Sequence, residues 1–453
     1  MPKTLNVATK PKPVRIGMMS LGCPKTLVDS EVILGKLNRV KYKLVPSVAD
    51  CDVALLNTCA FIQDAQQESI DRILELVELK KEKQIRGVIV MGCLVQRFPK
   101  ALQAELGEVD AFIGSGEYAK IPEIVDRVSE GSRVFSVGRP GYLSTSLETR
   151  VALTPGHYRY LKISEGCDHI CTFCVIPRFR GKHRSRTISD VLKEAQRLAD
   201  EGAKELILTG QDTTYFGRDT EGKFLLPELL KELDKIKGPE WIRLLYAYPA
   251  CVTRDLMEVI QSSSKICHYL DMPLQHASDR MLQAMKRGIT KRRTLDLLRE
   301  FRSVVPDLAI RTTFIVGFPG ETQEDFNELL EFMKEIRFER LGIFQYSQEE
   351  GSAAGRLPDQ IPEKIKEERW NQAMQLQQEI SLRNNQSLLR KTFKVLIEEK
   401  SEKKGEGWIG RSYMDAPEVD GNVFVNSSKS LQIGQFYPVT ITSTREYDLV
   451  GEF

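Results

Sequence analysis

The sequence has little of several features that would assign it to a special class. It contains no run of 18 apolar residues, which excludes a membrane-spanning helix. Its 65 Lys and Arg residues are nearly balanced by 63 Asp and Glu residues, so a protein held to nucleic acid by overall basicity is excluded as well. Residues 1–13 lack the apolar segment of a secretory signal, and we expect them to form a disordered tail. These absences predict a cytoplasmic protein.

Length and composition indicate a chain of about three globular domains. Of the 453 residues, 41% are hydrophobic and 28% are charged, as in ordinary globular proteins. A segment rich in Gly, Pro, Ser and Thr separates two regions in which strand and helix patterns alternate. We therefore predict a tail over 1–13, an α/β domain over 14–137, a linker over 138–155, a second α/β domain over 156–391 and a small all-β module over 392–453.

Hydrophobic periodicity predicts a parallel sheet in the first domain, because apolar runs alternate with helical patterns at 29–37 and 64–79. The second domain has six strand–helix units, too few for a closed eight-fold barrel and suited to an open, partial one. A long polar helix is expected over 361–391, followed by a small β-barrel. The predicted strands are 14–19, 53–56, 87–91 and 111–113 in the first domain, 159–163, 205–208, 242–246, 269–272, 309–316 and 341–344 in the second, and 393–397, 408–409, 422–425 and 436–442 in the module.

Nine cysteines in a chain without an export signal indicate metal binding or catalysis rather than disulfides. Cys167, Cys171 and Cys174 lie on one short loop after the first strand of the second domain. Three such thiolates can hold three irons of a [4Fe-4S] cluster and leave the fourth iron open to a small molecule. The alternatives are a zinc site, a redox Cys-x-x-Cys pair and chance. The zinc site lacks a fourth ligand at the usual spacing, since His169 lies inside the loop.

A second set of three cysteines follows three predicted strands of the first domain: Cys23, Cys59 and Cys93. Ligands bind beyond the carboxyl ends of the strands in open α/β sheets, so these residues are expected to converge on one crevice. Each is preceded by a small residue, which we interpret as room for a bulky inorganic cofactor. The alternative is three buried core cysteines. Outside both sets, Cys51, Cys251 and Cys267 are interpreted as core or incidental thiols.

On these cysteines, the chain resembles the radical S-adenosylmethionine (SAM) methylthiotransferases over nearly its whole length. The resemblance implies an N-terminal methylthiotransferase domain, a radical SAM barrel and a C-terminal TRAM module. It also implies an enzyme with two [4Fe-4S] clusters, one at Cys167, Cys171 and Cys174 that binds SAM, and an auxiliary one at Cys23, Cys59 and Cys93 associated with sulfur delivery. An electron donor and a sulfur donor are implied but not identified, and no catalytic residue beyond the cluster ligands is assigned.

The same resemblance indicates where SAM would bind. Gly210 and Gln211 follow the second barrel strand, where the family holds the methionine amine, and a glycine there allows close backbone approach. Val316 and Gly317 follow the fifth strand, where the adenine lies, although their Gly/Pro pattern also suits an ordinary turn. Arg243 on the third strand is predicted to face the cavity, with a structural role as the equal alternative.

Two motifs resemble the branch of the family that modifies a ribosomal protein. Residues 20–25 read Ser-Leu-Gly-Cys-Pro-Lys and residues 271–276 read Asp-Met-Pro-Leu-Gln-His, whereas the tRNA branch has Gln-Met-Asn and Gln-Ser-Gly at the corresponding places. Thr26 stands where Asn is expected. The resemblance implies methylthiolation of the β-carbon of an aspartate in protein twelve of the small ribosomal subunit, free or assembled. It also implies that a deoxyadenosyl radical abstracts a hydrogen from that carbon before sulfur is added.

Charge offers a separate argument about the partner. Residues 392–453 contain seven Lys and Arg residues and ten Asp and Glu residues, a net charge of −3. An acidic module suits a basic protein and argues against tRNA, although an acidic surface without a partner is the alternative. One basic run could oppose this interpretation, because it could contact RNA. It could equally bind a carboxylate or only face solvent. The run consists of Arg178, Arg180, Lys182, Arg184 and Arg186.

Three functions therefore compete. The preferred one is the ribosomal-protein methylthiotransferase. The second is a tRNA adenosine methylthiotransferase with the same chemistry. The third is a non-enzymatic iron–sulfur carrier, which does not account for SAM-type loops within a barrel.

Overall fold

The computed structural model describes residues 12–37, 40–402 and 407–453. The predicted tail therefore lies outside the described residues, except for its last two. Contacts divide the chain into two units, Met1–Leu153 with Arg178–Gly181, and Thr154–Pro177 with Lys182–Phe453, and each is described by itself. No helix of the described ranges is long and apolar enough to cross a membrane.

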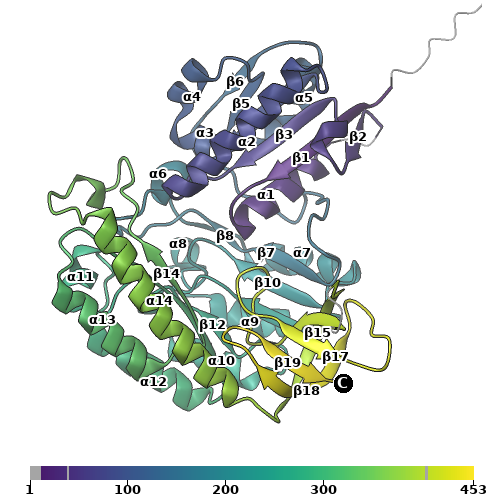
Figure 1. The fold of residues 1–453 in the computed structure, drawn as a ribbon. Coiled ribbons are helices and arrows are strands. Elements are labelled where there is room, and N and C mark those ends of the chain that lie inside the picture. The colour runs from purple at the N-terminus through teal and green to yellow at the C-terminus, as the bar shows by residue number, and fades with distance from the viewer. Residues whose placement is uncertain (1–11, 38–39, 403–406) are drawn as a thin grey trace, which may run out of the picture. The chain divides into compact units, whose positions relative to one another are not determined.

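The first unit is built on a six-stranded parallel sheet with the order β2-β1-β3-β4-β5-β6, which confirms the predicted architecture (Figure 1). The central strands β3 and β4 are buried along their whole length, as expected for strands with helices on both faces. The strands are β1 Val14–Ser20, β2 Tyr42–Val45, β3 Val53–Thr58, β4 Gly87–Gly92, β5 Ala111–Gly114 and β6 Val134–Ser136, and the helices are α1 Pro24–Gly35, α2 Gln63–Lys81, α3 Cys93–Arg97, α4 Pro99–Glu105 and α5 Ile121–Ser129.

Two strands of this sheet were not predicted, β2 and β6. Both are short edge strands, so their apolar pattern is too brief to detect. Helix α1 also begins five residues earlier than predicted, with Pro24 in its first turn, where proline is well tolerated. Residues 138–153 contain no helix or strand and belong to the first unit, since Glu31 of α1 accepts hydrogen bonds from Arg150 and the Leu153 amide.

The second unit contains the six predicted parallel strands in two hydrogen-bonded groups, β11-β10-β7 and β12-β13-β14. A parallel bridge between Ile242 and Ile266, and a hydrogen bond from the Ala247 amide to the Asp271 carbonyl, connect the groups. The result is the expected partial barrel. Its strands are β7 Tyr158–Lys162, β10 Glu205–Thr209, β11 Trp241–Leu244, β12 Tyr269–Asp271, β13 Ala309–Val316 and β14 Arg340–Gln345, with a small hairpin of β8 Ser164–Glu165 and β9 Arg184–Ser185.

Threonine side chains start four of the helices around this barrel. Each accepts a hydrogen bond from a backbone amide of the first turn, which satisfies a donor that has no partner within the helix. These residues are Thr187, Thr253, Thr290 and Thr322. The helices of the unit are α7 Ile188–Asp200, α8 Arg218–Glu221, α9 Leu226–Asp234, α10 Arg254–Ser262, α11 Asp279–Ala284, α12 Lys291–Val304, α13 Gln323–Ile336 and α14 Glu363–Gln386, and the short α6 Ile176–Arg180 runs across the division between the units.

The C-terminal module is a closed five-stranded barrel with the order β15-β16-β17-β19-β18. Four strands were predicted, and the fifth, β19, pairs with both β17 and β18 and thereby closes the barrel. Small branched side chains fill the interior, as in other narrow barrels. The strands are β15 Thr392–Lys400, β16 Trp408–Arg411, β17 Val423–Asn426, β18 Phe436–Thr444 and β19 Leu449–Glu452.

Candidate iron–sulfur sites

Cys23, Cys59 and Cys93 lie at one edge of the first unit's sheet. They follow the carboxyl ends of β1, β3 and β4, which are adjacent strands. The cysteines are therefore neighbours in space although 36 and 34 residues separate them in sequence. A Cβ atom placed on Gly22 would lie 3.0 Å from the sulfur of Cys59, which shows how closely the first two loops approach.

The small residues before these cysteines have a structural reason that the sequence did not reveal. Gly22 and Gly92 adopt φ angles of 94° and 100°, which favour glycine. A Cβ on Gly92 would lie 2.3 Å from Oδ1 of Asn57. The Thr58 hydroxyl donates to the Met91 carbonyl at 2.6 Å. Backbone conformation and packing against protein atoms therefore account for these residues, and the interpretation as space for a cofactor is not needed.

A buried arginine reaches this cysteine set. Nε of Arg180 donates to the sulfur of Cys93 at 3.2 Å, and its Nη1 is 2.7 Å from the carboxylate of Asp29. Burial raises the pKa of the Cys93 thiol to about 12, against the opposing positive charge of Arg180. Burial also opposes ionisation of Cys23, but the charges of Lys25 and Arg180 lower the pKa of that thiol. The site thus combines thiols and positive charge, which suits metal binding through thiolates.

The second set lies on the loop that follows β8 in the second unit. Burial raises the pKa values of Cys167 and Cys174 to about 12, and the neighbouring cysteines of the set add to this effect. Nη1 of Arg287 donates to the sulfur of Cys171 at 3.4 Å. Both sets therefore contain three thiols that influence one another, with an arginine bonded to one sulfur.

Other residues of the loop hold it in place and leave the thiols available. Nε2 of His169 lies 2.6 Å from Oδ2 of the buried Asp212, and the His169 ring stacks on Tyr248 at 3.6 Å between centroids. The Thr172 amide donates to the Met285 carbonyl at 3.1 Å. His169 is thus directed at Asp212 and Tyr248 and serves as an anchor of the loop.

One cluster of potential ligands was not anticipated. Ligand atoms of His169, Asp212 and Cys251 all lie within 4.8 Å of one another. Asp212 already accepts hydrogen bonds from the Thr214 amide and hydroxyl and from the Tyr215 amide, so its carboxylate is occupied by protein donors. Asp212 follows a predicted strand end, which is the one sequence signal that could have drawn attention to it. No such signal marks Arg287, which is recognisable only from the structure.

Gly210 and Gln211 lie beside buried polar atoms that have no hydrogen-bond partner in the described part of the chain. Gln211 donates to Oε1 of Glu165 at 2.6 Å, while its own Oε1 is buried without a hydrogen bond. Oγ of Ser164 is also buried without a hydrogen bond among the described residues, and a Cβ on Gly210 would lie 2.5 Å from it. Buried polar groups are normally hydrogen-bonded, so a polar ligand at the ends of β7 and β10 would satisfy them. The residues present therefore fit a group that donates hydrogen bonds, such as an amino group.

Val316 and Gly317 form the turn at the end of β13. The Val316 carbonyl accepts from the Tyr346 amide, and the Gly317 amide donates to Glu321 at 2.7 Å. Gly317 has a φ angle of 74°, and a Cβ there would lie 2.3 Å from Cγ of Lys366. These contacts account for the Gly/Pro pattern by turn geometry, and a role of the two residues toward SAM remains a proposal.

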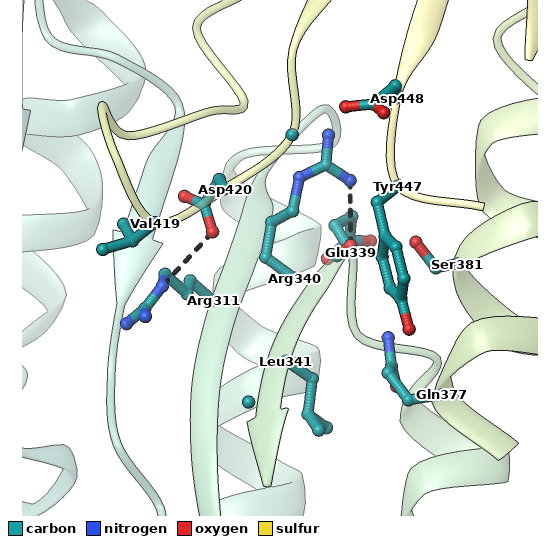
Figure 2. Close-up of a pocket in the computed structure, with 12 residues that line it drawn as sticks. Arg311, Glu339, Arg340, Leu341, Gln377, Ser381, Val419, Asp420, Tyr447 and Asp448 are labelled. Carbon is teal, nitrogen blue, oxygen red and sulfur yellow. Dashed lines mark hydrogen bonds and ion pairs between the residues drawn. The ribbon is translucent and has the colours of Figure 1, made fainter. Parts of the chain in front are cut away.

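A cavity of about 250 Å³ lies where β13 and β14 begin, at the end of the barrel opposite the cysteine loop. Figure 2 shows Arg311 directed at Asp420 within it. Arg311 lies 2.8 Å from Asp271 and 3.2 Å from Asp420, and Arg340 lies 2.5 Å from Asp415. Because these charged groups already neutralise one another, we assign no ligand to this cavity.

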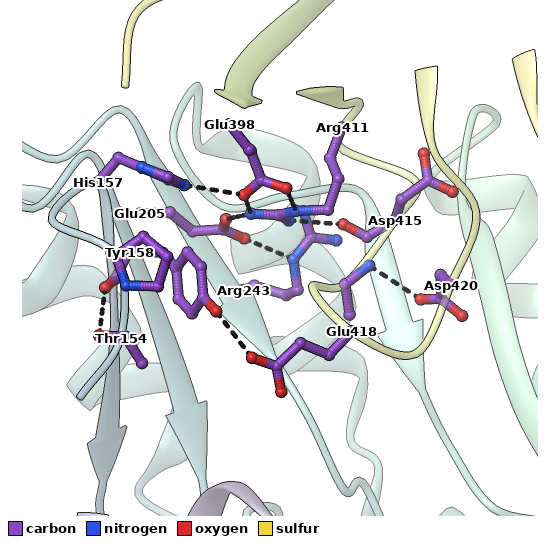
Figure 3. A network of polar contacts seen from close by, with 12 residues as sticks. Thr154, His157, Tyr158, Glu205, Arg243, Glu398, Arg411, Asp415, Glu418 and Asp420 are labelled. Atoms are coloured by element: carbon purple, nitrogen blue, oxygen red, sulfur yellow. Dashed lines mark hydrogen bonds and ion pairs between the residues drawn. The ribbon is translucent and has the colours of Figure 1, made fainter. Parts of the chain in front are cut away.

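The prediction that Arg243 binds the cofactor is wrong. Its side chain is fully buried and lies 2.6 Å from Glu205, and its Nη1 donates to the Tyr413 carbonyl of the C-terminal module at 2.6 Å. Glu205 also bonds to Arg411, which in turn bonds to Glu398 (Figure 3). The guanidinium is therefore used to attach the module to the barrel, the structural alternative that the sequence left open.

Two of the ten acidic residues of the module are not free on its surface. The side chains of Asp415 and Asp420 are 1% and 3% exposed and pair with Arg340 and Arg311 of the partial barrel. Their charges are compensated within the unit, whereas Glu399, Glu402, Glu446 and Glu452 are exposed, so the net charge of −3 is not a measure of the charge that the module presents to a partner. Glu418 is exposed but accepts a hydrogen bond from Tyr158 at 3.0 Å.

The basic run after the cysteine loop divides between the two units. Arg180 belongs to the first unit, whereas Arg186 is buried in the second and pairs with Asp190 and Glu194 at 2.7 and 2.5 Å. Only Arg178 and Lys182 of the run are exposed. The run is therefore not a continuous basic surface, which removes the main argument for RNA contact.

Comparisons with known proteins cover the whole of this architecture. The sequence matches the Radical SAM superfamily over residues 161–333, the uncharacterized protein family UPF0004 over 15–114 and the TRAM domain over 391–453. The fold resembles that of the radical S-adenosylmethionine methyltransferase TsrM from Kitasatospora setae, with a TM-score of 0.56, 16% identity, and coverage of 74% of this chain and 75% of that one.

Similar proteins of nearly the same length carry one name. The ribosomal protein uS12 methylthiotransferase RimO of Pelotomaculum thermopropionicum is 49% identical, with 97% of this chain and 99% of that protein aligned. The protein of the same name from Thermoanaerobacter sp. is 47% identical at the same coverage, and that from Clostridioides difficile is 45% identical, covering 97% and 98%. Because the identity is 45–49% and the alignments cover 97% of the chain, the chain belongs to the RimO family of radical SAM methylthiotransferases.

Proposed function

We propose that this enzyme adds a methylthio group to the β-carbon of an aspartate in ribosomal protein uS12. The observation that carries the proposal is the full-length similarity, at 44–49% identity, to proteins named uS12 methylthiotransferases. It is supported by the two cysteine sets, one at the ends of three adjacent strands and the other on one loop after β8. The net charge of the TRAM module is not counted as evidence for the substrate, because two of its acidic residues, Asp415 and Asp420, pair with arginines within the unit.

The cofactors are iron–sulfur and SAM, and we further propose two [4Fe-4S] clusters. Cys167, Cys171 and Cys174 would hold the one that binds SAM, and Cys23, Cys59 and Cys93 the auxiliary one. Bound there, the two groups supply the electron that cleaves SAM and the sulfur that is transferred.

Residues of the second unit would position SAM. Oε1 of Gln211 and Oγ of Ser164 are buried acceptors without partners, suited to an amino group, and Gly210 lets the backbone approach. Val316 and Gly317 would contribute backbone contacts to the adenine. Burial of these groups away from water would protect a reactive species from side reactions.

The test compares two substrate classes on the reconstituted full-length enzyme. SAM and a chemical reductant are supplied with purified uS12, with small subunits containing uS12, or with unmodified tRNA, and products are analysed by mass spectrometry. We expect a methylthio addition on an aspartate of uS12 and none on tRNA. Modification of tRNA alone would overturn the substrate assignment. Clusters without any SAM cleavage would instead favour an iron–sulfur carrier.

A further inference from the structure

Each cysteine set has one buried arginine that donates to a cysteine sulfur. Arg180 donates to Cys93 at 3.2 Å in the first unit, and Arg287 donates to Cys171 at 3.4 Å in the second. Both arginines are 5% exposed. Each cysteine set thus has an arginine–sulfur hydrogen bond.

Arg287 is a buried charge in need of a counter-charge. In the described part of the chain, no carboxylate lies within ion-pairing distance of its guanidinium, and its Nε has no hydrogen-bond partner. Its other contacts are with the Pro273 carbonyl at 2.6 Å and the Tyr248 ring at 4.4 Å. A buried cation without an anionic partner is costly. The Cys171 sulfur supplies that partner once it is a metal-bound thiolate.

Arg180 differs in that its charge is shared. Asp29, which is 1% exposed, pairs with it at 2.7 Å, while Nε remains directed at Cys93. The carboxylate also holds the guanidinium in orientation. Arg180 therefore offers its cysteine set a hydrogen bond and a partly compensated charge, whereas Arg287 offers a hydrogen bond and a full charge.

We propose that Arg180 and Arg287 are positioning residues that separately raise the reduction potentials of the two clusters, Arg180 for the auxiliary cluster and Arg287 for the SAM-binding one. This inference rests on the proposed function, since it assumes clusters at both cysteine sets. Hydrogen bonds to the sulfurs and local charge are among the factors that set such potentials. Adding an electron makes a cluster more negative, and a nearby guanidinium stabilises that state more than the oxidised one.

The experiment measures each potential in the full-length protein. Two backgrounds each carry one cluster, because the three cysteines of the other set are replaced by Ala, and reduction is followed by EPR-monitored redox titration. We expect Arg180→Gln to disfavour reduction of the auxiliary cluster and Arg287→Gln that of the SAM-binding cluster. A tenfold change in the reduction equilibrium constant corresponds to 59 mV for one electron. We expect about tenfold for Arg287→Gln and a smaller change for Arg180→Gln.

Two controls make the result specific, and a double variant is held in reserve for Arg180→Gln. Arg186→Gln removes a buried arginine of the same basic run whose hydrogen bonds go to oxygen atoms, and it should leave both potentials unchanged. Arg287→Lys keeps the positive charge but not the planar guanidinium. It should lower the reduction potential of the SAM-binding cluster less than Arg287→Gln does. If Arg180→Gln fails to fold because Asp29 is left unpaired, Arg180→Gln with Asp29→Asn replaces it.

The outcomes separate this inference from the proposed function. Potentials that do not change, or that change equally in the Arg186→Gln control, would overturn the roles of the two arginines while leaving the clusters in place. A wild-type protein that does not bind iron at both cysteine sets would overturn the two-cluster proposal itself. Iron and sulfide content, measured on every variant, distinguishes these results.

Discussion

At the scale of single residues, the surroundings of a cysteine distinguish a candidate ligand from a core thiol. Cys51 is fully buried, and its thiol donates to the Val48 carbonyl at 3.0 Å. Cys267 is 3% exposed, and burial raises the pKa of its thiol to about 12. These residues fit the interpretation as core thiols. Cys171, by contrast, lies on a loop that other side chains anchor, and its sulfur accepts from an arginine.

Cys171→Ala should therefore remove one cluster only. We expect loss of SAM cleavage and of about half the bound iron, because the remaining cysteine set lies in the other unit. Iron analysis and Mössbauer spectra measure the change. Cys267→Ala is the matched control, a buried cysteine outside both sets, and should keep the full iron content. Loss of both clusters in Cys171→Ala would contradict separate sites.

At the scale of elements, buried ion pairs attach the C-terminal barrel to the partial barrel. Glu205 on β10 is fully buried and lies between Arg243 of β11 and Arg411 of β16 at 2.6 and 2.7 Å. Burial opposes its ionisation, but the two arginines lower the pKa of Glu205. The carboxylate is therefore charged, and it compensates two buried cations from different elements.

Glu205→Gln should destabilise the second unit strongly. Breaking a buried ion pair by removing one partner costs roughly 3–5 kcal/mol, because the other charge is left uncompensated. Thermal or denaturant unfolding measures the loss. The control is Glu240→Gln, whose partner Lys394 also belongs to the C-terminal barrel. That pair is close to half exposed, so its loss should cost only about 0.2–1 kcal/mol. Equal effects would contradict the importance of burial.

Acid should weaken the same connection through Glu398. Burial opposes its ionisation, but the hydrogen bond with His157 and the charge of Arg411 lower the pKa of Glu398 to about 2. The unfolded chain has the higher pKa, so this stabilisation is complete above about pH 4.5 and is lost as the pH falls toward 2. The free energy of unfolding should fall on the order of 2 kcal/mol over that interval. Glu398→Gln should remove this part of the pH dependence, and a wild-type-like acid profile in the variant would exclude Glu398 as its origin.

At the scale of the whole molecule, the two cysteine sets belong to two different units of the chain. The two units are not separated at a single point of the sequence. The segment Arg178–Gly181 follows the second unit's cysteine loop in sequence but belongs to the first unit. Through it, Arg180 is provided to the auxiliary set from outside the first domain. The division predicts that SAM cleavage and sulfur transfer can be separated by mutation.

Cys59→Ala should separate them. We expect the variant to form deoxyadenosine from SAM, because the SAM-binding set is intact, but to make no methylthio product on uS12. Chromatography of the nucleoside and mass spectrometry of the protein measure the two activities. The control is Cys51→Ala, a buried cysteine of the same unit that lies outside the set, which should retain both. Normal product from Cys59→Ala would remove the auxiliary site from the mechanism.

Local patterns determined a large part of this protein. The order of strands and helices follows from hydrophobic periodicity, which reports burial of one face or of a whole strand. The cysteine positions followed from that order, because the carboxyl ends of adjacent parallel strands meet at one edge. The short strands β2, β6 and β19 escaped prediction, since three or four residues carry too weak a pattern.

Tertiary structure alone decided the partners of the charged side chains. Arg243 and Tyr413 are 170 residues apart, and Arg180 and Cys93 are 87 apart, distances along the chain at which no spacing rule applies. The net charge of the C-terminal module likewise did not reveal that Asp415 and Asp420 are neutralised by arginines from another domain. A charge acts through burial and its nearest partner, and both are set only when distant segments pack together.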